Sequence, residues 1–239
     1  MHGRSIPLTT ARTFVADLSH AAWKVPQGVI MRSINVSAVM AARKRMDKKP
    51  PLTAYFVKAW AEVARELPEL RRTYVTLPWP RLYEHGTSIA SLMIEREMQG
   101  EKVLFPARIK SPAERDLVEV AADIEAAVTQ PIMAISRNRM SLRVSRLPLL
   151  VRRLIWWLAF NLPRQRQHYV GTFGVSVLGH LGTSILYPVS PTTTFLSYGP
   201  IAPDGMVDIM VGFDHRVMDG AVVAIAIGLL EEKLKGLAA

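Results

Sequence analysis

The sequence of 239 residues contains no cysteine. This absence excludes disulfides, zinc sites built on thiolates and thiol nucleophiles. None of the six histidines has a partner at the i, i+4 spacing that two zinc ligands take on a helix, so no metal is expected. Motifs of other enzyme classes are missing too: there is no G-x-S-x-G nucleophile elbow, no G-x-G-x-x-G turn and no Walker phosphate loop.

The sequence also lacks a long apolar run. Its most apolar stretch, within residues 141–166, is interrupted by paired arginines well short of the roughly 18 apolar residues that a transmembrane helix needs. The opening residues, MHGRSIPLTTAR, contain no apolar stretch, so no secretory signal is expected. We therefore expect a cytoplasmic protein, with peripheral contact at the inner membrane surface as the alternative.

Linkers and repeats are absent, since no low-complexity segment divides the chain. With 49% hydrophobic residues, a chain of this length can bury one large core, which predicts a single domain over residues 1–239. Strand patterns at 87–95 and 103–109, joined across Gln99-Gly100, and a helical pattern at 53–67 occur without a regular βαβ rhythm. This arrangement favours an α/β (α+β) fold with a mixed sheet flanked by helices.

Acidic residues are few. Twenty of them stand against 30 lysines and arginines, which gives a net charge of +10. Such a charge attracts a polyanion such as coenzyme A or an anionic membrane surface, but it is equally typical of a solvated basic surface. Nucleic acid is not expected as a partner, because no helix-turn-helix, zinc-finger or RNP-like motif accompanies the charge.

The most informative feature present is the heptapeptide DHRVMDG at residues 214–220. The segment before it, 205–213, alternates and is rich in β-branched residues, which predicts a strand. The segment after it, 221–234, is apolar at helical spacing. A histidine at such a junction is fixed by rigid elements on both sides, as a general base must be, and an imidazole titrates near neutral pH. His215 is therefore the candidate base; the alternative is a structural histidine satisfied by hydrogen bonds.

Several segments together resemble the 2-oxoacid dehydrogenase acyltransferase family, whose members include the catalytic domains of dihydrolipoyl acyltransferases. DHRVMDG matches the family's HxxxDG signature, and IPLTTAR resembles its IPL-x-x-x-R opening. In the family's order follow LTAYFVKAWAEVARELPEL, SPAERDLVEVAADIE and GTFGVSVLGHLGTSILYPVSP, which resemble two helices and a strand with its loop. The resemblance covers the chain except for residues around 129–170, and it implies a chloramphenicol-acetyltransferase-like fold.

The resemblance implies that an acyl group passes directly from a thioester to a thiol or hydroxyl acceptor. His215 would remove the acceptor's proton, with coenzyme A as the acyl carrier and with no metal and no covalently attached lipoyl group. Ser176, in GTFGVSVLG, matches the family's hydroxyl that donates to the tetrahedral oxyanion; its alternative is an ordinary strand serine. His180, close by in the sequence, is expected to be structural.

Three more residues complete the implied site. In the family, the aspartate of the signature pairs with an arginine of the first helix and braces the active-site loop. This implies an ion pair between Arg12 and Asp219, in place of a relay from Asp219 to His215. Gly220 is expected to allow a turn or a close backbone approach that a side chain would block.

The assembly is also expected from the resemblance. The active site should lie between the subunits of a homotrimer, with His215 from one subunit and Ser176 from its neighbour. Because IPLTTAR begins at residue 6, no lipoyl or peripheral-subunit-binding domain is expected. The acceptor would then come in trans, as a lipoyl protein, an acyl-carrier protein or a free small molecule. The short end after the last predicted helix implies a trimer that assembles no further.

Residues 141–166, SLRVSRLPLLVRRLIWWLAFNLPRQR, depart most from the family. Pro148 suits the first turn of a helix and Pro163 ends it. Arg146 and Arg153 fall on one narrow polar line of that helix and are expected to be exposed.

The same helix, 148–162, has three interpretations. It is a core or subunit-interface helix with Trp156 or Trp157 packed on protein, a helix that lies on a membrane, or a wall of an apolar acyl pocket. The function has matching alternatives. The leading hypothesis is a standalone CoA-dependent acyltransferase, and its rivals are a non-catalytic trimeric scaffold and a membrane-associated acyltransferase with a lipid-like acceptor.

Overall fold

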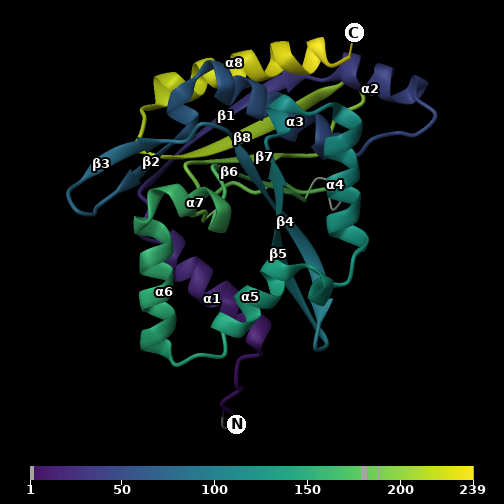
Figure 1. Ribbon diagram of the computed structural model, residues 1–239. Helices are drawn as coiled ribbons and strands as arrows, with labels where there is room; N and C mark the ends of the chain where they lie inside the picture. The colour runs from purple at the N-terminus through teal and green to yellow at the C-terminus, as the bar shows by residue number, and fades with distance from the viewer. Residues whose placement is uncertain (1–2, 179–181, 188, 239) are drawn as a thin grey trace.

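A six-stranded mixed sheet forms the centre of the structure, a computed structural model that describes residues 3–178, 182–187 and 189–238 (Figure 1). Its strands, in order across the sheet, are β1 (Gln27–Asn35), β8 (Met206–Asp214), β7 (Thr194–Tyr198), β6 (Phe173–Val177), β4 (Ile89–Met98) and β5 (Glu101–Lys110). β6 runs parallel to β4 and to β7, whereas the other neighbouring pairs are antiparallel. The predicted mixed sheet flanked by helices is confirmed.

The β4–β5 hairpin turns at Gln99 and Gly100, whose φ angles are both positive, 57° and 75°. Two successive positive φ angles suit the two-residue turns whose twist matches that of the flanking strands. The predicted connection across these two residues is therefore confirmed. A separate two-stranded hairpin, β2 (Arg72–Val75) with β3 (Arg81–Glu84), is not among the predicted elements.

One face of the sheet carries the main core. It is covered by α3 (Leu52–Glu66) and α8 (Gly220–Gly236), with α2 (Ser37–Arg45) and α4 (Leu117–Thr129) beside them (Figure 1). The aromatic side chains of α3, Tyr55, Phe56 and Trp60, are fully buried. The indole N–H of Trp60 donates to Thr194 Oγ1 on β7 at 3.2 Å, so its one polar group is satisfied within the core.

The opposite face is only partly filled. It carries α1 (Thr10–Ala22), α5 (Ser136–Val144), α6 (Leu149–Asn161) and α7 (Pro163–Tyr169) (Figure 1). Phe14 of α1 stacks on Phe105 of β5, with ring centroids 6.1 Å apart. The buried carboxylate of Asp17 accepts from Arg152 Nε at 2.7 Å and so joins α1 to α6. The 3₁₀ turns η1 (Pro68–Arg71), η2 (Pro112–Glu114) and η3 (Ile132–Ala134) connect these layers.

The predicted helix after Pro148 is α6. No residue of α6 is buried within one chain, so α6 is not part of a single-chain core, and the interpretation as a subunit-interface helix stays a prediction. Trp156 packs on protein as predicted, since its ring lies 6.2 Å from that of Phe14. Arg146 is exposed as expected, but Arg153 is only partly exposed because it faces Asp17 at 3.9 Å.

None of the helices within the described ranges is long and apolar enough to cross a membrane.

Candidate active site

His215 lies in the turn that joins the end of β8 to the start of α8. Its backbone N–H donates to the carbonyl of Pro26 at 3.0 Å, which ties the turn to the residues before β1. Its ring lies 5.0 Å from that of Phe213, the last core aromatic of β8. The strand and helix occur where the sequence predicts them, so this imidazole is held between two rigid elements.

Asp214 fixes the same turn from inside the protein. Its buried carboxylate accepts from the backbone N–H, the Nε and the Nη2 of Arg216, at 3.0, 2.9 and 2.7 Å. The guanidinium carbon of Arg216 in turn lies 4.6 Å from the ring centroid of Tyr74. Bidentate, charge-assisted hydrogen bonds of this kind are both strong and directional, so the turn that carries His215 has one defined shape.

The imidazole of His215 faces Asp219 across this turn. Nδ1 of His215 lies 3.4 Å from Oδ1 of Asp219, with the two side chains 54% and 87% exposed. A contact this exposed contributes little to stability. The contact places the Nδ1 edge of the ring toward the carboxylate and leaves Nε2 on the edge away from Asp219.

The predicted ion pair between Arg12 and Asp219 is wrong. Arg12 instead binds Glu101 at the start of β5, with Nε to Oε1 at 2.6 Å, and Thr9 donates to the same carboxylate at 2.7 Å. These hydrogen bonds, from Thr9 first and then Arg12, lower the pKa of Glu101. The reason is the direction of α1. Its C-terminal end, at Ala22, reaches the cleft at His215, and Arg12 lies roughly 15 Å away along the helix axis.

Two glycines allow close approaches beside the turn. A side chain at Gly220, the first residue of α8, would come within 3.1 Å of Ile30 Cδ1. Gly28 on β1 lies opposite Phe213 on β8 and is more tightly constrained, because a Cβ at position 28 would lie 2.4 Å from the Phe213 ring. Gly220 is predicted from the sequence, whereas Gly28 is not, because its partner Phe213 lies on a strand far away in the sequence.

Ser176 is buried on β6 and lies on the face of the sheet opposite the main core. It pairs in register with Ser197 of β7, which in turn pairs with Met210 of β8. His215 follows Met210 by five residues, which corresponds to roughly 17 Å along the strand direction. Ser176 and His215 of one chain are therefore too far apart to act on one carbonyl group.

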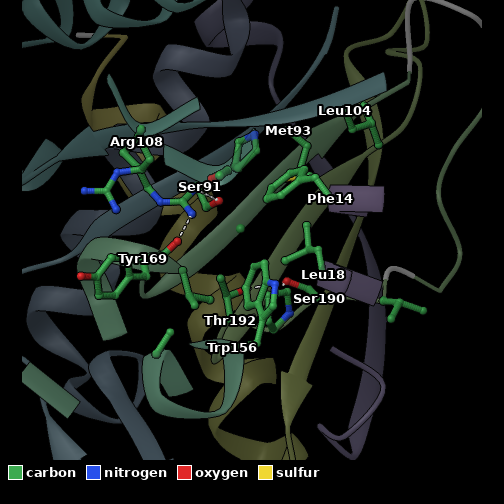
Figure 2. A pocket seen from close by; sticks show the side chains of 18 of the residues that line it. Phe14, Leu18, Ser91, Met93, Leu104, Arg108, Trp156, Tyr169, Ser190 and Thr192 are labelled. Atoms are coloured by element: carbon green, nitrogen blue, oxygen red, sulfur yellow. Dashed lines mark hydrogen bonds between the residues drawn. The ribbon is translucent and has the colours of Figure 1, made fainter. Parts of the chain in front are cut away.

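A large cavity lies between this face of the sheet and helices α1, α5 and α6. It encloses about 840 Å³, and Ser176 is in its wall. Most of the lining is apolar, as Figure 2 shows for Phe14, Leu18, Met93, Leu104 and Trp156. The interpretation of the 148–162 helix as a pocket wall therefore matches the geometry, because Trp156 and its neighbours on α6 face the cavity.

A smaller cleft of about 410 Å³ lies at His215. The end of α1 and the start of β1 form one side of it, through Trp23 and Gln27 among others. Tyr187 and Val189 line both this cleft and the large cavity, so the segment that precedes β7 separates the two spaces. The large cavity is thus next to the histidine cleft, but His215 does not line it.

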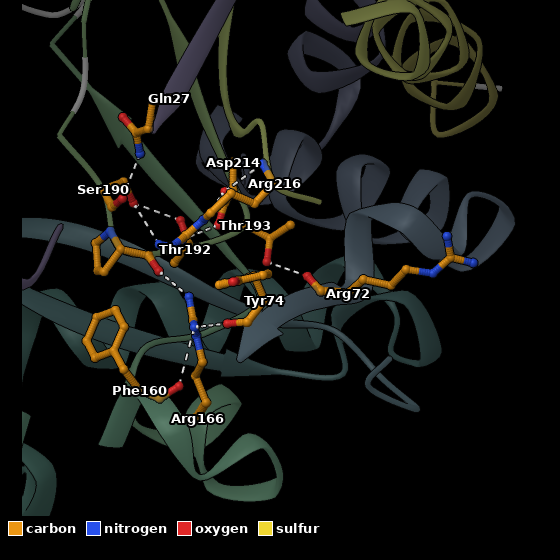
Figure 3. Close-up of polar contacts among 11 residues, drawn as sticks. Gln27, Arg72, Tyr74, Phe160, Arg166, Ser190, Thr192, Thr193, Asp214 and Arg216 are labelled. Carbon is orange, nitrogen blue, oxygen red and sulfur yellow. Dashed lines mark hydrogen bonds and ion pairs between the residues drawn. The ribbon is translucent and has the colours of Figure 1, made fainter. Parts of the chain in front are cut away.

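A buried arginine anchors this dividing segment (Figure 3). Arg166 of α7 donates to the carbonyls of Tyr74 at 2.9 Å and Pro191 at 3.1 Å, and burial lowers its pKa to about 10. Ser190 and Thr192, on either side of Pro191, bond to each other at 2.7 Å. The sequence offers no signal for this arrangement, because the partners of Arg166 are backbone carbonyls distant in the sequence.

Among the residues that the structure describes, the remaining histidines form no second site. His85 is buried, and burial together with the positive charges of Arg166, His168 and Arg71 lowers its pKa to about 4. His180 lies outside the described residues. No group of three or more histidine and carboxylate side chains in the described ranges could hold a metal ion.

The sheet order, the two helical layers and the strand–turn–helix at His215 together define the fold that positions the candidate site. Comparison with solved structures identifies it as the fold shared by chloramphenicol acetyltransferase and the catalytic cores of dihydrolipoamide acetyltransferases, as the sequence resemblance implies. Comparison with protein-family models and with curated protein sequences finds no match.

The individual neighbours cover nearly the whole chain. A probable dihydrolipoamide acetyltransferase from Listeria monocytogenes is 18% identical with a TM-score of 0.70. The alignment covers 98% of this chain and 95% of that protein's chain. The Azotobacter vinelandii dihydrolipoamide acetyltransferase is 20% identical with a TM-score of 0.69, and the alignment covers 98% of this chain and 92% of that one. For that enzyme, catalytic roles of a serine, a histidine and an asparagine four residues after the histidine have been investigated. A chloramphenicol acetyltransferase is 15% identical with a TM-score of 0.54, and the alignment covers 98% of this chain and 96% of that one.

Proposed function

We propose that this protein is a CoA-dependent acyltransferase that moves an acyl group directly from a thioester to a thiol or hydroxyl acceptor. The observation that carries the proposal is the placement of His215. On this fold it stands at the mouth of a cleft, fixed by the Asp214–Arg216 pair and oriented by Asp219. In the Azotobacter neighbour the investigated histidine is followed four residues later by an asparagine, and the residue at that spacing here is Asp219, which supports a similar role for His215.

In the proposed reaction, Nε2 of His215 takes the proton from the acceptor's thiol or hydroxyl as that atom attacks the thioester carbonyl. The carbonyl oxygen becomes an oxyanion, which needs a hydrogen-bond donor aimed at it. Collapse of the tetrahedral intermediate breaks the carbon–sulfur bond, and the departing CoA thiolate takes the proton back from His215. No acyl-enzyme forms, since the acyl group passes between two bound molecules.

The oxyanion donor would be Ser176 of a neighbouring subunit. The separation of Ser176 and His215 along the sheet keeps these two residues of one chain from acting on the same carbonyl group, which supports a site shared between subunits. We therefore infer a homotrimer in which each site takes His215 from one subunit and Ser176 from the next. The acceptor would arrive in trans, as a lipoyl protein, an acyl-carrier protein or a small molecule.

The direct test is turnover of acyl-CoA. Purified protein is given acetyl-, butyryl- and decanoyl-CoA with dihydrolipoamide and with alcohols, and release of free CoA thiol is followed. His215→Ala should reduce transfer by about 10²–10⁴-fold, the usual contribution of a general base. His20→Ala, at an exposed position on α1, is the matched control and should retain activity. Equal turnover by His215→Ala and wild type would reject the assignment, and no transfer with any pair would favour the non-catalytic scaffold.

A membrane-associated acyltransferase with a lipid-like acceptor is the second candidate, and one observation favours it. The outer face of α6 exposes Leu150 (82%), Leu154 (54%) and Trp157 (45%) on a protein with a net charge of +10. Apolar side chains with tryptophan on a basic protein suit insertion into an anionic lipid surface. The alternative occupant of this face is a second subunit.

A further inference from the structure

Two arginines stand in the wall of the large apolar cavity without acidic partners. Arg108 of β5 donates to Ser91 Oγ and to the carbonyl of Tyr169 (Figure 2), and Arg137 of α5 lies with its guanidinium carbon 5.6 Å from the Tyr169 ring centroid. Among the described residues, neither arginine forms an ion pair with a carboxylate, and the Arg137 side chain forms no hydrogen bond. By contrast, Arg152 in the same helical layer has a carboxylate partner in Asp17.

Burial makes this arrangement costly. It lowers the pKa of Arg108 to about 9, with the positive charge of Arg137 as the second cause, and it lowers the pKa of Arg137 as well. The Nε of Arg108 is buried and has no hydrogen-bond partner in the described part of the chain. A guanidinium has five N–H groups, so three of those on Arg108 remain available after its two bonds. An anion between the two arginines would relieve both the repulsion and the unsatisfied donors.

The rest of the cavity is suited to a chain of carbon atoms. Phe14, Leu104 and Trp156 are in its wall, and its volume of about 840 Å³ is in the range of small-molecule pockets. The sheet register gives the distance between Arg108 and Ser176, and so the length of ligand that would span them. Arg108 pairs with Ser91, and Ser91 with Gly174, two residues before Ser176. Two strand spacings and two residues place the Cα atoms of Arg108 and Ser176 roughly 12 Å apart.

We propose that this cavity binds an amphipathic anion, with its carboxylate or phosphate head group between Arg108 and Arg137 and its alkyl chain along the apolar wall toward Ser176. The site requires a single anionic group and a medium-length chain, because the guanidinium pair is at one end and the proposed oxyanion donor at the other. The assignment of this ligand as the acyl acceptor rests on the proposed function, since a hydroxyl at the far end of the chain would then lie near the reacting carbonyl.

The binding test needs no turnover. Calorimetric titrations compare decanoate, decyl phosphate and uncharged decanol on the wild type, Arg137→Gln, Arg108→Gln and the control Arg139→Gln, an α5 arginine that does not line the cavity. We expect one or both anions to bind more tightly than decanol. Arg137→Gln should weaken anion binding about tenfold or more and leave decanol binding unchanged, and the control should behave as wild type. The tighter of the two anions identifies the head group as carboxylate or phosphate.

Decanol that binds as tightly as both anions, or anion binding that is unchanged in a folded Arg137→Gln variant, would overturn the proposal. Thermal unfolding checks that each variant is folded, and Arg137→Gln is the main variant because Arg108 also bonds to Ser91 and Tyr169. Repeating the titration on His215→Ala separates this inference from the proposed function, since binding should persist when transfer is lost.

The acceptor role has its own test. ω-Hydroxydecanoate and uncharged decanediol are compared as acceptors, and Arg137→Gln should raise the KM for the hydroxy acid alone, with kcat unchanged. Transfer to decanediol with equal KM values for both acceptors would overturn the acceptor role while the acyltransferase function stands. Arginine-dependent anion binding with no transfer to any acceptor would support the binding site and reject the proposed function.

Discussion

Arg12 and Glu101 form an ion pair, with Arg12 Nη2 2.5 Å from Glu101 Oε1, that ties the first turn of α1 to the start of β5. The pair lies at the end of α1 that is remote from His215. Arg12 therefore fixes the wall of the large cavity, whereas Asp219 is left to orient His215. The sequence resemblance implies that Asp219 pairs with Arg12 and braces the active-site loop, whereas in this protein Arg12 pairs with Glu101 and Asp219 faces His215.

The first prediction concerns this pair. Arg12→Met and Glu101→Gln should each lower the free energy of unfolding, and the double variant should cost less than the sum, because the two side chains interact directly. Thermal and urea unfolding of the four proteins measures the coupling. Since the folded-state pKa of Glu101 is lowered, the coupling is present above the unfolded-state pKa and is lost as the pH falls through the lowered value. Arg12→Met combined with Asp219→Asn should be additive, and coupling in that second cycle would restore the rejected pair.

The second prediction concerns Asp219. Its side chain is exposed, and its one ion-pair partner among the described residues is the His215 imidazole, so Asp219→Asn should leave the thermal midpoint nearly unchanged. It should lower kcat by about tenfold, about 1.4 kcal/mol in the activation barrier, since the ring loses the carboxylate that orients it. Asp47→Asn, at an exposed loop position, is the control. A large drop in stability with unchanged kcat would assign Asp219 a structural role.

Local patterns predict much of this fold. The alternating pattern before DHRVMDG predicts β8, and the apolar residues at helical spacing after it predict α8. Both patterns can be recognised because they are made by residues close together in the sequence. The turn that carries His215 follows from these two elements. The need for glycine at position 28 cannot be predicted in this way. The ring of Phe213 covers Gly28 only once β1 and β8 have paired, and these strands are far apart in the sequence.

The cavity position of Arg108 and Arg137 also cannot be predicted from local sequence patterns. Arg108 is a charged residue in a strand, and a charged side chain on a strand face normally points to water. Only the packing of α5 and α6 over this face turns it into a cavity wall. Likewise, the arginine line on α6 is visible in the sequence, but which apolar side faces the cavity depends on the contact of Trp156 with Phe14.

The third prediction tests the shared active site. Ser176→Ala alone should reduce transfer by about 10²–10³-fold, the usual effect of losing one oxyanion donor. His215→Ala and Ser176→Ala proteins are then unfolded, mixed in equal amounts and refolded together. If each site joins two subunits of a trimer, mixed trimers contain one intact site each, and about a quarter of the wild-type activity should return. A mixture that stays as inactive as its parents would show that the two residues do not meet across an interface.

The fourth prediction is a pH dependence of stability that comes from His85. Its folded-state pKa is about 4, below that of a free imidazole near 6.5, so the unfolded chain binds more protons between these values. Stability should therefore fall as the pH drops from about 6.5 toward 4, by on the order of 3 kcal/mol from this residue. Urea unfolding of wild type and His85→Gln, each referred to pH 7.5, measures the difference. Parallel pH curves for the two proteins would contradict a buried neutral His85.

The fifth prediction concerns the outer face of α6. Leu150, Leu154 and Trp157 point away from the cavity, whereas Trp156 packs inward on Phe14. We expect the outer face to pack on another subunit, because apolar side chains on a regular helix face are normally covered. Trp157→Glu should then lower the apparent mass in analytical ultracentrifugation, while Arg164→Glu, at an exposed position beyond the helix, should not. Vesicle co-sedimentation separates the membrane alternative, since apolar insertion resists salt and charge attraction does not. Binding to anionic vesicles that survives physiological salt and is abolished by Trp157→Glu, with the assembly unchanged, would assign this face to the membrane.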